Sequence, residues 1–356
     1  MNDNKTSKNS IVAKFAVPIS FLILFFLAAN FTDCDLVTFW KRRNHLTDLV
    51  VDMIPPDFSY IQKILLPLFY TIQMSVTGTV LGTFFALVLS PFGAANLGFP
   101  AVIRRILRIV IQILRSFPAL ILALTATFLF GLGTFAGTFA ITLYTFAIMT
   151  KLTYEDASAA DVKAYQALRA MGVSKYVAYI HGILPEIIPG FLTNALYLLE
   201  TNVRHSSILG YVGAGGIGLL LNEKISWLEY DKVGTILLML FLTVCVIEYF
   251  SRYLAALIRK ERTIKKEQAR LLLLFLAALF LICTFTLSLP DFSRTSPQTL
   301  RNMFAGFLQP DWSFFFSAEK DGLGYLLLET VCIAFIGTVI GAIVSAPLAF
   351  LNTKRF

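Results

Sequence analysis

Eight long apolar runs dominate the sequence, and each is close to the length that a helix needs to cross a lipid bilayer. A spanning helix takes about 20 mostly apolar residues, because its backbone polar groups must be satisfied within the segment. Hydrophobic residues make up 57% of the chain and charged residues 15%, against about 25% charged in an ordinary soluble domain. The sequence therefore predicts an all-α, polytopic membrane protein with spans at 11–30, 65–91, 106–130, 135–150, 187–209, 233–258, 271–289 and 325–351.

The basic residues indicate an orientation in the membrane rather than a nucleic-acid surface. The net charge is +8, but Lys and Arg fall in short clusters between the apolar runs and not along one stripe. With the N-terminus in the cytoplasm, most of these clusters lie on the inner side, as the positive-inside rule requires. Lys41, Arg42 and Arg43 are the exception, and neighbouring aspartates offset them. We expect a multi-pass protein of the cytoplasmic (inner) membrane, in contact with lipid and without a nucleic-acid partner.

The sequence offers no constellation that would support catalysis. The four cysteines and three histidines lie far apart and show neither a disulfide framework nor metal-ligand spacing. A P-loop and a nucleophile elbow are also missing. We expect no catalytic residue, metal or cofactor in this chain, so that any ATP must be bound by a partner.

A parallel repeat with a spacing of about 255 residues divides the chain. The stretch "PPDFSYIQKI" at Pro55 returns as "QPDWSFFFSA" at Gln309, and "TIQMSVTGTVLG" at Thr71 returns as "TVCIAFIGTVIG" at Thr330. A lone apolar run precedes each copy. Such duplication is common in transporters, whose substrate path lies between related halves. We expect a transmembrane domain of six spans over 1–260 and the first two spans of an incomplete second copy over 261–356.

The longest polar connection of the first copy, 151–185, is expected to be helical. It is rich in Ala and Leu, Gly172 permits a break, and Pro185 precedes the next span. The pattern predicts two short helices joined at Gly172 on the cytoplasmic face. A mere connecting loop is the alternative.

Within this connection, "QALRAMG" followed by "LP" resembles the signature of ATP-binding-cassette (ABC) importer permeases. In that family the segment forms coupling helices that sit in a groove of the partner ATPase. Gln166 stands where the family usually has Glu, and Gly182 where it has Ile. The resemblance implies ATPase-coupling roles for Gln166, Ala167, Leu168, Gly172, Leu184 and Pro185.

Most of the first copy is similar to the permeases of phosphonate importers. The stretch "LETNVRHSSILGYVGAGGIG" from Leu199 follows the E-x-N-x-R and G-A-G-G-I-G pattern of that family, and the likeness covers about 57–257. It implies a type I importer permease with a second permease domain or homodimer partner, an ABC ATPase dimer and a periplasmic or lipid-anchored substrate-binding protein. Phosphonate, phosphite and phosphate are the implied substrates.

Charged and glycine residues in this stretch are the candidates for a translocation path or gate. Charges at membrane depth usually face a cavity or one another, so an ion pair between Glu200 and Arg204 that only steadies the helix is the alternative. The spacing G-x-G-x-x-G also matches a dinucleotide loop, but an apolar helix precedes it where that loop needs a strand. The candidates are Glu200, Asn202, Arg204, Ser206, Gly213, Gly215, Gly216 and Gly218.

Two other functions remain open at this stage. The glycine-rich element also occurs in methionine-type permeases, so the chain could serve an importer of methionine or another amino acid. A channel-like membrane protein is the further alternative, although a channel has no need of the 151–185 segment.

Overall fold

The computed structural model describes residues 20–33, 36–261, 265–288, 301–302, 305–306, 309, 312–317 and 322–351. Within these ranges every regular element is helical, which confirms the all-α prediction. The chain forms two compact units, one from Met1–Asp48 with Arg301–Phe356 and one from Leu49–Leu300. Residues 1–19, which include the expected inner basic residues and the start of the first span, lie outside the described ranges, as does Asp311.

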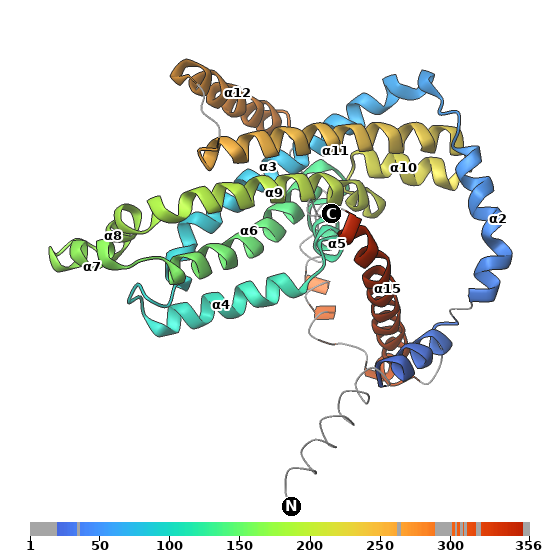
Figure 1. Cartoon of the computed structure of the whole chain (residues 1–356), viewed down its shortest axis with the longest axis horizontal. Coiled ribbons are helices and arrows are strands. Elements are labelled where there is room, and N and C mark those ends of the chain that lie inside the picture. The colour runs from blue at the N-terminus through green and yellow to red at the C-terminus, as the bar shows by residue number, and fades with distance from the viewer. Residues whose placement is uncertain are drawn as a thin grey trace, which may run out of the picture. The chain divides into compact units, whose positions relative to one another are not determined.

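The unit Leu49–Leu300 holds most of the helices (Figure 1). In chain order they are η1 (Phe58–Tyr60), α3 (Ile61–Gly93), α4 (Ala101–Ser116), α5 (Ala119–Phe130), α6 (Thr134–Ala159), α7 (Lys163–Ala170), α8 (Lys175–Gly182), α9 (Leu184–Leu209), η2 (Gly210–Val212), α10 (Ile217–Ser226), α11 (Tyr230–Ile258) and α12 (Lys266–Phe285). The other unit contains the helix Ser20–Phe31, α14 (Trp312–Phe315) and α15 (Leu323–Leu351), while α2 (Leu36–Asp52) crosses the boundary between the units.

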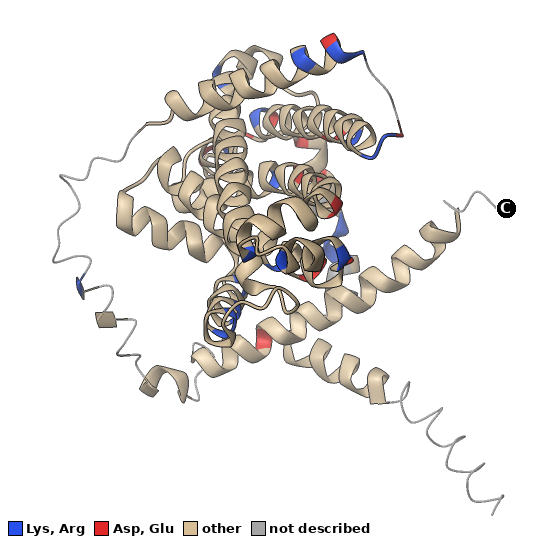
Figure 2. Cartoon of the chain, turned by 90° about the vertical axis from the view of Figure 1, so that its left-hand side faces the viewer, with Lys and Arg blue, Asp and Glu red and all other residues tan. Residues whose placement is uncertain are grey.

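Long apolar helices account for most of the predicted spans. Five described helices are long and apolar enough to cross a membrane, and two bent helix pairs bring the number to as many as seven. The first predicted span is described only as the shorter helix Ser20–Phe31. Figure 2 shows the long helices mostly free of charge, with Lys and Arg in short groups.

The prediction of one straight span over 106–130 is wrong. The chain bends by 94° between α4 and α5, and Phe117 at the break has extended backbone angles, φ −83° and ψ 125°. Pro118 causes this break, because its ring disfavours helical angles at the preceding residue and it lacks the N–H that would continue the helix. A second bend of 70° separates α8 from α9, whose first turn contains Pro185.

Two glycines allow α3 and α6 to approach closely. A Cβ at Gly78 would lie 2.7 Å from Ile141 Cγ2, and one at Gly82 would lie 2.7 Å from the Thr142 carbonyl oxygen. Small residues four apart are a common device for packing helices in lipid, where no hydrophobic effect drives helices together. The α3–α6 pair is therefore the close-packed centre of this unit.

Each lone helix that precedes a predicted copy lies against a long helix of the other predicted copy. The helix Ser20–Phe31 contacts α15 through Phe21 and Phe335, whose ring centroids are 5.1 Å apart. On the other unit, Gln73 of α3 donates from Nε2 to the Cys283 carbonyl (3.1 Å) and to Thr286 Oγ1 (2.8 Å) of α12. The two compact units therefore divide the chain differently from the predicted domains, and the domain boundary at 260/261 stays a prediction.

Candidate functional site

The E-x-N-x-R element lies on α9, and its residues face two opposite directions. Asn202 is fully buried and donates from Nδ2 to Thr79 Oγ1 and Thr145 Oγ1, both at 2.8 Å. Ser206 lies one turn further on the same face, with its hydroxyl 2.6 Å from the Ser75 hydroxyl. These two residues fasten α9 to α3 and α6 from inside the bundle.

Glu200 and Arg204 occupy the other face of α9. They form an ion pair at i,i+4, with side chains 13% and 51% exposed, respectively. Since two residues along an α-helix correspond to about 200° of rotation, Asn202 points away from both. The structure thus separates the predicted path residues into a buried pair that holds the helix and a charged pair on the opposite face, of which only Arg204 is largely exposed.

Sequence reasoning missed the partners of Asn202 and Ser206. Thr71, Ser75, Thr79 and Thr83 follow one another at intervals of four along α3, which places hydroxyls on a single helix face. Three of these hydroxyls bond carbonyls of their own helix, such as Ser75 to Thr71 at 2.8 Å. This four-residue spacing is the sequence signal from which a polar contact face could have been predicted.

The glycine turn after α9 is close-packed rather than flexible. Gly213, Gly215 and Gly216 have φ of 83°, 80° and 73°, angles that other residues rarely adopt. A Cβ at Gly218 would lie 1.8 Å from the Ser207 carbonyl oxygen, so the start of α10 touches the backbone of α9. The Ile217 N–H donates to Thr71 Oγ1 at 2.8 Å.

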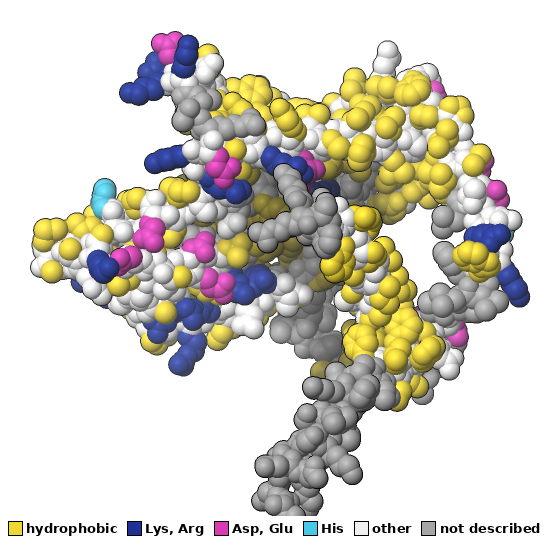
Figure 3. Space-filling model, in the orientation of Figure 1, with side chains coloured by type: hydrophobic (Ala, Val, Ile, Leu, Met, Phe, Trp, Pro, Cys, Tyr) yellow, Lys and Arg dark blue, Asp and Glu magenta, His cyan; other side chains and the backbone are white. Residues whose placement is uncertain are grey.

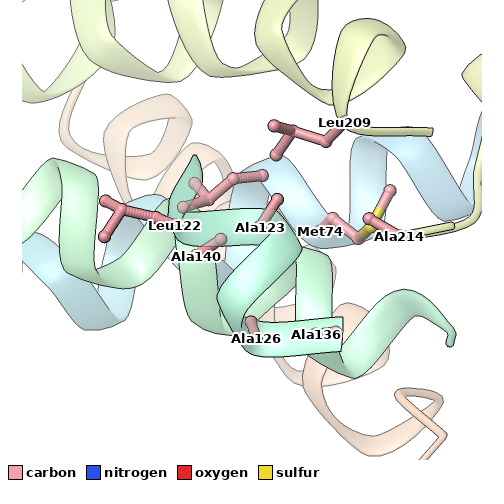
Figure 4. Close-up of a cluster of buried hydrophobic side chains, with 9 residues drawn as sticks. Met74, Leu122, Ala123, Ala126, Ala136, Ala140, Leu209 and Ala214 are labelled. Atoms are coloured by element: carbon pink, nitrogen blue, oxygen red, sulfur yellow. The ribbon is translucent and has the colours of Figure 1, made fainter. Parts of the chain in front are cut away.

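A buried apolar cluster surrounds this turn. Ala214 is fully buried among Met74, Leu122, Ala123, Ala126, Ala136, Ala140, Ile141 and Leu209 (Figure 4). The cluster joins α3, α5, α6 and α9 around the glycines. No strand precedes the glycines in the described part of the chain, so the dinucleotide-loop interpretation has no structural support.

The asparagine contact leads to a stability prediction. Asn202→Ala removes two hydrogen bonds between helices and should lower the free energy of unfolding by about 1–2 kcal/mol, the upper range for such bonds in membrane proteins. Thr201→Ala is the matched control, since that exposed hydroxyl only bonds the Tyr197 carbonyl of its own helix. Thermal unfolding in detergent measures both variants, and equal melting temperatures would contradict a fastening role for Asn202.

The two short helices predicted within 151–185 are present as α7 and α8, joined at Gly172 with φ +84°. Gln166, Ala167 and Pro185 are exposed, whereas Leu168 and Leu184 are half-buried against a cluster that includes Tyr165, Tyr179 and Ile183. A Cβ at Gly182 would lie 2.8 Å from the Tyr165 backbone nitrogen, which explains a glycine there. The helix pair therefore presents Gln166 and Ala167 on its surface.

A buried lysine joins the end of α10 to the short connection that precedes α11. Lys224 is only 6% exposed, and its Nζ lies 2.9 Å from Glu229 Oε2, 3.1 Å from Glu223 Oε1 and 4.1 Å from the Trp227 ring centroid. Burial disfavours the ammonium, but contact with the two carboxylates outweighs it and raises the pKa of Lys224 above its ordinary value. Lys232 and Lys224 together hold the pKa of Glu229 below its usual range.

Comparison with known proteins identifies the family. Residues 78–263, more than half of the chain, match the family described as binding-protein-dependent transport system inner membrane component. The phosphite transport system permease protein PtxC of Stutzerimonas stutzeri is 31% identical over 217 residues, which cover 61% of this chain and 79% of that protein. The phosphate-import permease protein PhnE of Mycolicibacterium smegmatis is 31% identical over 203 residues, 57% of this chain and 38% of that protein.

Solved structures agree on the fold. The inward-facing MetNI methionine ABC transporter superposes with a TM-score of 0.50 at 20% identity, over 57% of this chain and 99% of that one. At this identity the likeness concerns the type I permease fold alone. The family match covers more than half of the chain, and the long apolar helices and the paired helices α7 and α8 agree with it. The chain therefore belongs to the binding-protein-dependent transport system inner membrane components.

Proposed function

We propose that this chain is the permease subunit of an ABC importer that carries a phosphorus oxyanion such as phosphonate, phosphite or phosphate. The similarity to a phosphite permease over 79% of its length is the observation that carries this proposal. A member of this family is a multi-pass inner-membrane protein that works with a substrate-binding protein and an ATPase. ATP hydrolysis then belongs to the partner, and this chain supplies the path.

The exposed face of α9 is proposed to line that path. A charge at membrane depth costs about 2.5–3.5 kcal/mol on insertion scales unless it faces a cavity or a partner. Arg204 satisfies this with Glu200, yet half of its side chain remains exposed. A passing oxyanion can therefore compete with the Glu200 carboxylate for the planar guanidinium, which binds phosphoryl oxygens in a bidentate manner.

The other candidates in this stretch are proposed to position Arg204 rather than to touch substrate. Asn202 and Ser206 hold α9 from the buried side. Gly213, Gly215, Gly216 and Gly218 fix the end of the helix. Residues that support a site from behind in this way keep the charged face in one orientation.

The segment 151–185 is proposed to dock on the ATPase, with the N-terminus of the chain and α7–α8 on the cytoplasmic side. Ala167 and Gln166 lie exposed on α7, where a partner could contact them. Gln166 would offer an uncharged contact in place of the family's Glu. The predicted second copy, with α12 and α15, is proposed to belong to the second permease domain that closes the path.

The test is substrate-stimulated ATP hydrolysis by the assembly reconstituted with its ATPase and binding protein. Methylphosphonate, phosphite or phosphate should stimulate hydrolysis, and methionine should not. Arg204→Gln should reduce that stimulation at least about tenfold, which corresponds to about 1.4 kcal/mol. Stimulation by methionine alone would replace the oxyanion assignment with an amino acid importer.

A matched control is available on α11. Arg252 forms the same i,i+4 pair with Glu248 and is 76% exposed. Arg252→Gln should leave the stimulation unchanged. If the two arginine variants behave alike, Arg204 does not line the path.

A further inference from the structure

One face of α4 carries an arginine cluster around a small cavity that is open to the surroundings. The cavity has a volume of about 210 Å³ and is lined by Ala101, Arg104, Arg105, Arg108, Ile109 and Gln112. One water needs about 10–15 Å³ of such space, so a tetrahedral anion fits with room for solvent. In Figure 3, charged side chains gather at the end of this unit that carries α4, α7 and α8.

The positive charge of this cluster has no protein counterion among the described residues. None of the ion pairs found there includes Arg104, Arg105 or Arg108. They are the fourth, fifth and eighth residues of α4, so all three lie in its N-terminal half. The arginines repel one another, so an anion bound there would remove an unfavourable interaction.

Two of the three arginines are oriented by backbone carbonyls at the end of α3 and in the loop that follows it. Arg108 donates from Nε to the Gly93 carbonyl at 3.0 Å, and its guanidinium lies 5.0 Å from the Tyr154 ring centroid. Arg104 reaches the Ala95 carbonyl at 3.4 Å. Both groups are therefore oriented before a ligand arrives, which lowers the entropy cost of binding.

The loop is also tied to α6 and to the proposed coupling helices. Asn96 donates from Nδ2 to the Ala157 carbonyl at 3.0 Å, and the Tyr165 hydroxyl donates to the Leu97 carbonyl at 2.6 Å. The loop that follows α3 therefore contacts both Arg104 of the cluster and Tyr165 of α7.

We propose that the cavity at Arg104, Arg105 and Arg108 binds a phosphoryl oxyanion. A guanidinium fork matches two phosphoryl oxygens, and Gln112 can donate a further hydrogen bond from its amide. Free phosphate or phosphonate leaving the path and the headgroup of an anionic phospholipid share this chemistry. The free-anion source rests on the proposed function, whereas the headgroup source does not.

Binding is measured on the full chain in nanodiscs, with two probes. Inorganic phosphate is titrated by equilibrium dialysis in phosphatidylcholine discs at low salt. Retained phosphatidylglycerol is counted by native mass spectrometry after reconstitution with that lipid. Arg105→Gln should weaken the binding of phosphate or of phosphatidylglycerol at least about tenfold, because it removes a charged donor of the cluster. Arg105→Lys should bind more tightly than Arg105→Gln but less tightly than the parent, because lysine keeps the positive charge and lacks the planar guanidinium.

Arg42→Gln, which removes a charge from an exposed position of α2, is the control and should bind like the parent. Loss confined to the phosphate probe identifies the free anion, and loss confined to phosphatidylglycerol identifies the headgroup. Unchanged binding of both probes by Arg105→Gln would overturn the proposal. The substrate-stimulated ATP hydrolysis test does not depend on either binding result. An oxyanion importer that lacks this site would pass that test and fail this one. An importer of another solute that has this site would do the reverse.

Discussion

Gly218→Ala is expected to destabilise the permease by about 3 kcal/mol or more and to abolish transport. The added Cβ would lie 1.8 Å from the Ser207 carbonyl oxygen and 3.0 Å from Gly210 Cα. Both are backbone positions, so relief requires α9 and α10 to separate. Overpacking of a core typically costs about 1–3 kcal/mol when side chains can adjust, and here they cannot. Thermal unfolding in detergent measures the loss.

Gly190→Ala is the matched control on α9 itself. A Cβ at Gly190 meets no atom within 4 Å, and Ala is favoured over Gly in a helix by about 0.5–1 kcal/mol. This variant should melt at or above the temperature of the parent protein. If Gly218→Ala melts together with Gly190→Ala, the corner between α9 and α10 is not close-packed in the membrane.

Helix content was predictable from the sequence because lipid restricts the choices. Apolar runs of sufficient length can only be helices there, and α3, α6, α9, α11, α12 and α15 confirm the runs from which they were predicted. The bend at Phe117 could also have been predicted, because the following proline disfavours helical backbone angles at the residue before it. Hydropathy alone hid the bend, because apolar residues continue from α4 into α5.

The faces of the helices were much harder to assign. The match to E-x-N-x-R grouped Glu200, Asn202 and Arg204 as one set, although helical rotation places Asn202 opposite the other two. Only the tertiary contacts of Asn202 with Thr79 and Thr145 show which face is inside. In a soluble helix the polar face is the exposed one, but in lipid a polar residue is as often turned inward, so pattern alone cannot decide.

The packing of α12 on α3 could not have been predicted from composition either. A lone apolar run carries no signal for its partner helix, because most of its surface is equally compatible with lipid. Gln73 is the specific element, since a buried amide in the middle of α3 needs a partner and finds the end of α12.

One helix, α6, contacts both proposed sites. It contains Thr145, whose hydroxyl accepts a hydrogen bond from Asn202, and Ala157, whose carbonyl accepts one from Asn96. The loop that orients the arginine cluster and the helix that bears Arg204 are therefore both attached to α6.

A bulky residue at Ala167 should uncouple the permease from its ATPase without unfolding it. Ala167 is exposed on α7 and lies within the proposed docking segment, so Ala167→Trp adds an indole where a partner groove must close. Affinity for the ATPase should fall at least about 100-fold, or about 2.7 kcal/mol, and substrate-stimulated hydrolysis should be lost with it. The melting temperature of the isolated permease should stay within the small range of ordinary surface substitutions.

Ser226→Trp provides the matched control, because Ser226 is an exposed residue on α10, away from the coupling helices in the chain. It should bind the ATPase as the parent does. Co-purification and titration of the ATPase onto permease in nanodiscs separate the two variants. Undiminished ATPase binding by Ala167→Trp would mean that α7 does not enter the partner's groove. The segment 151–185 would then share the helices of a coupling segment without its function.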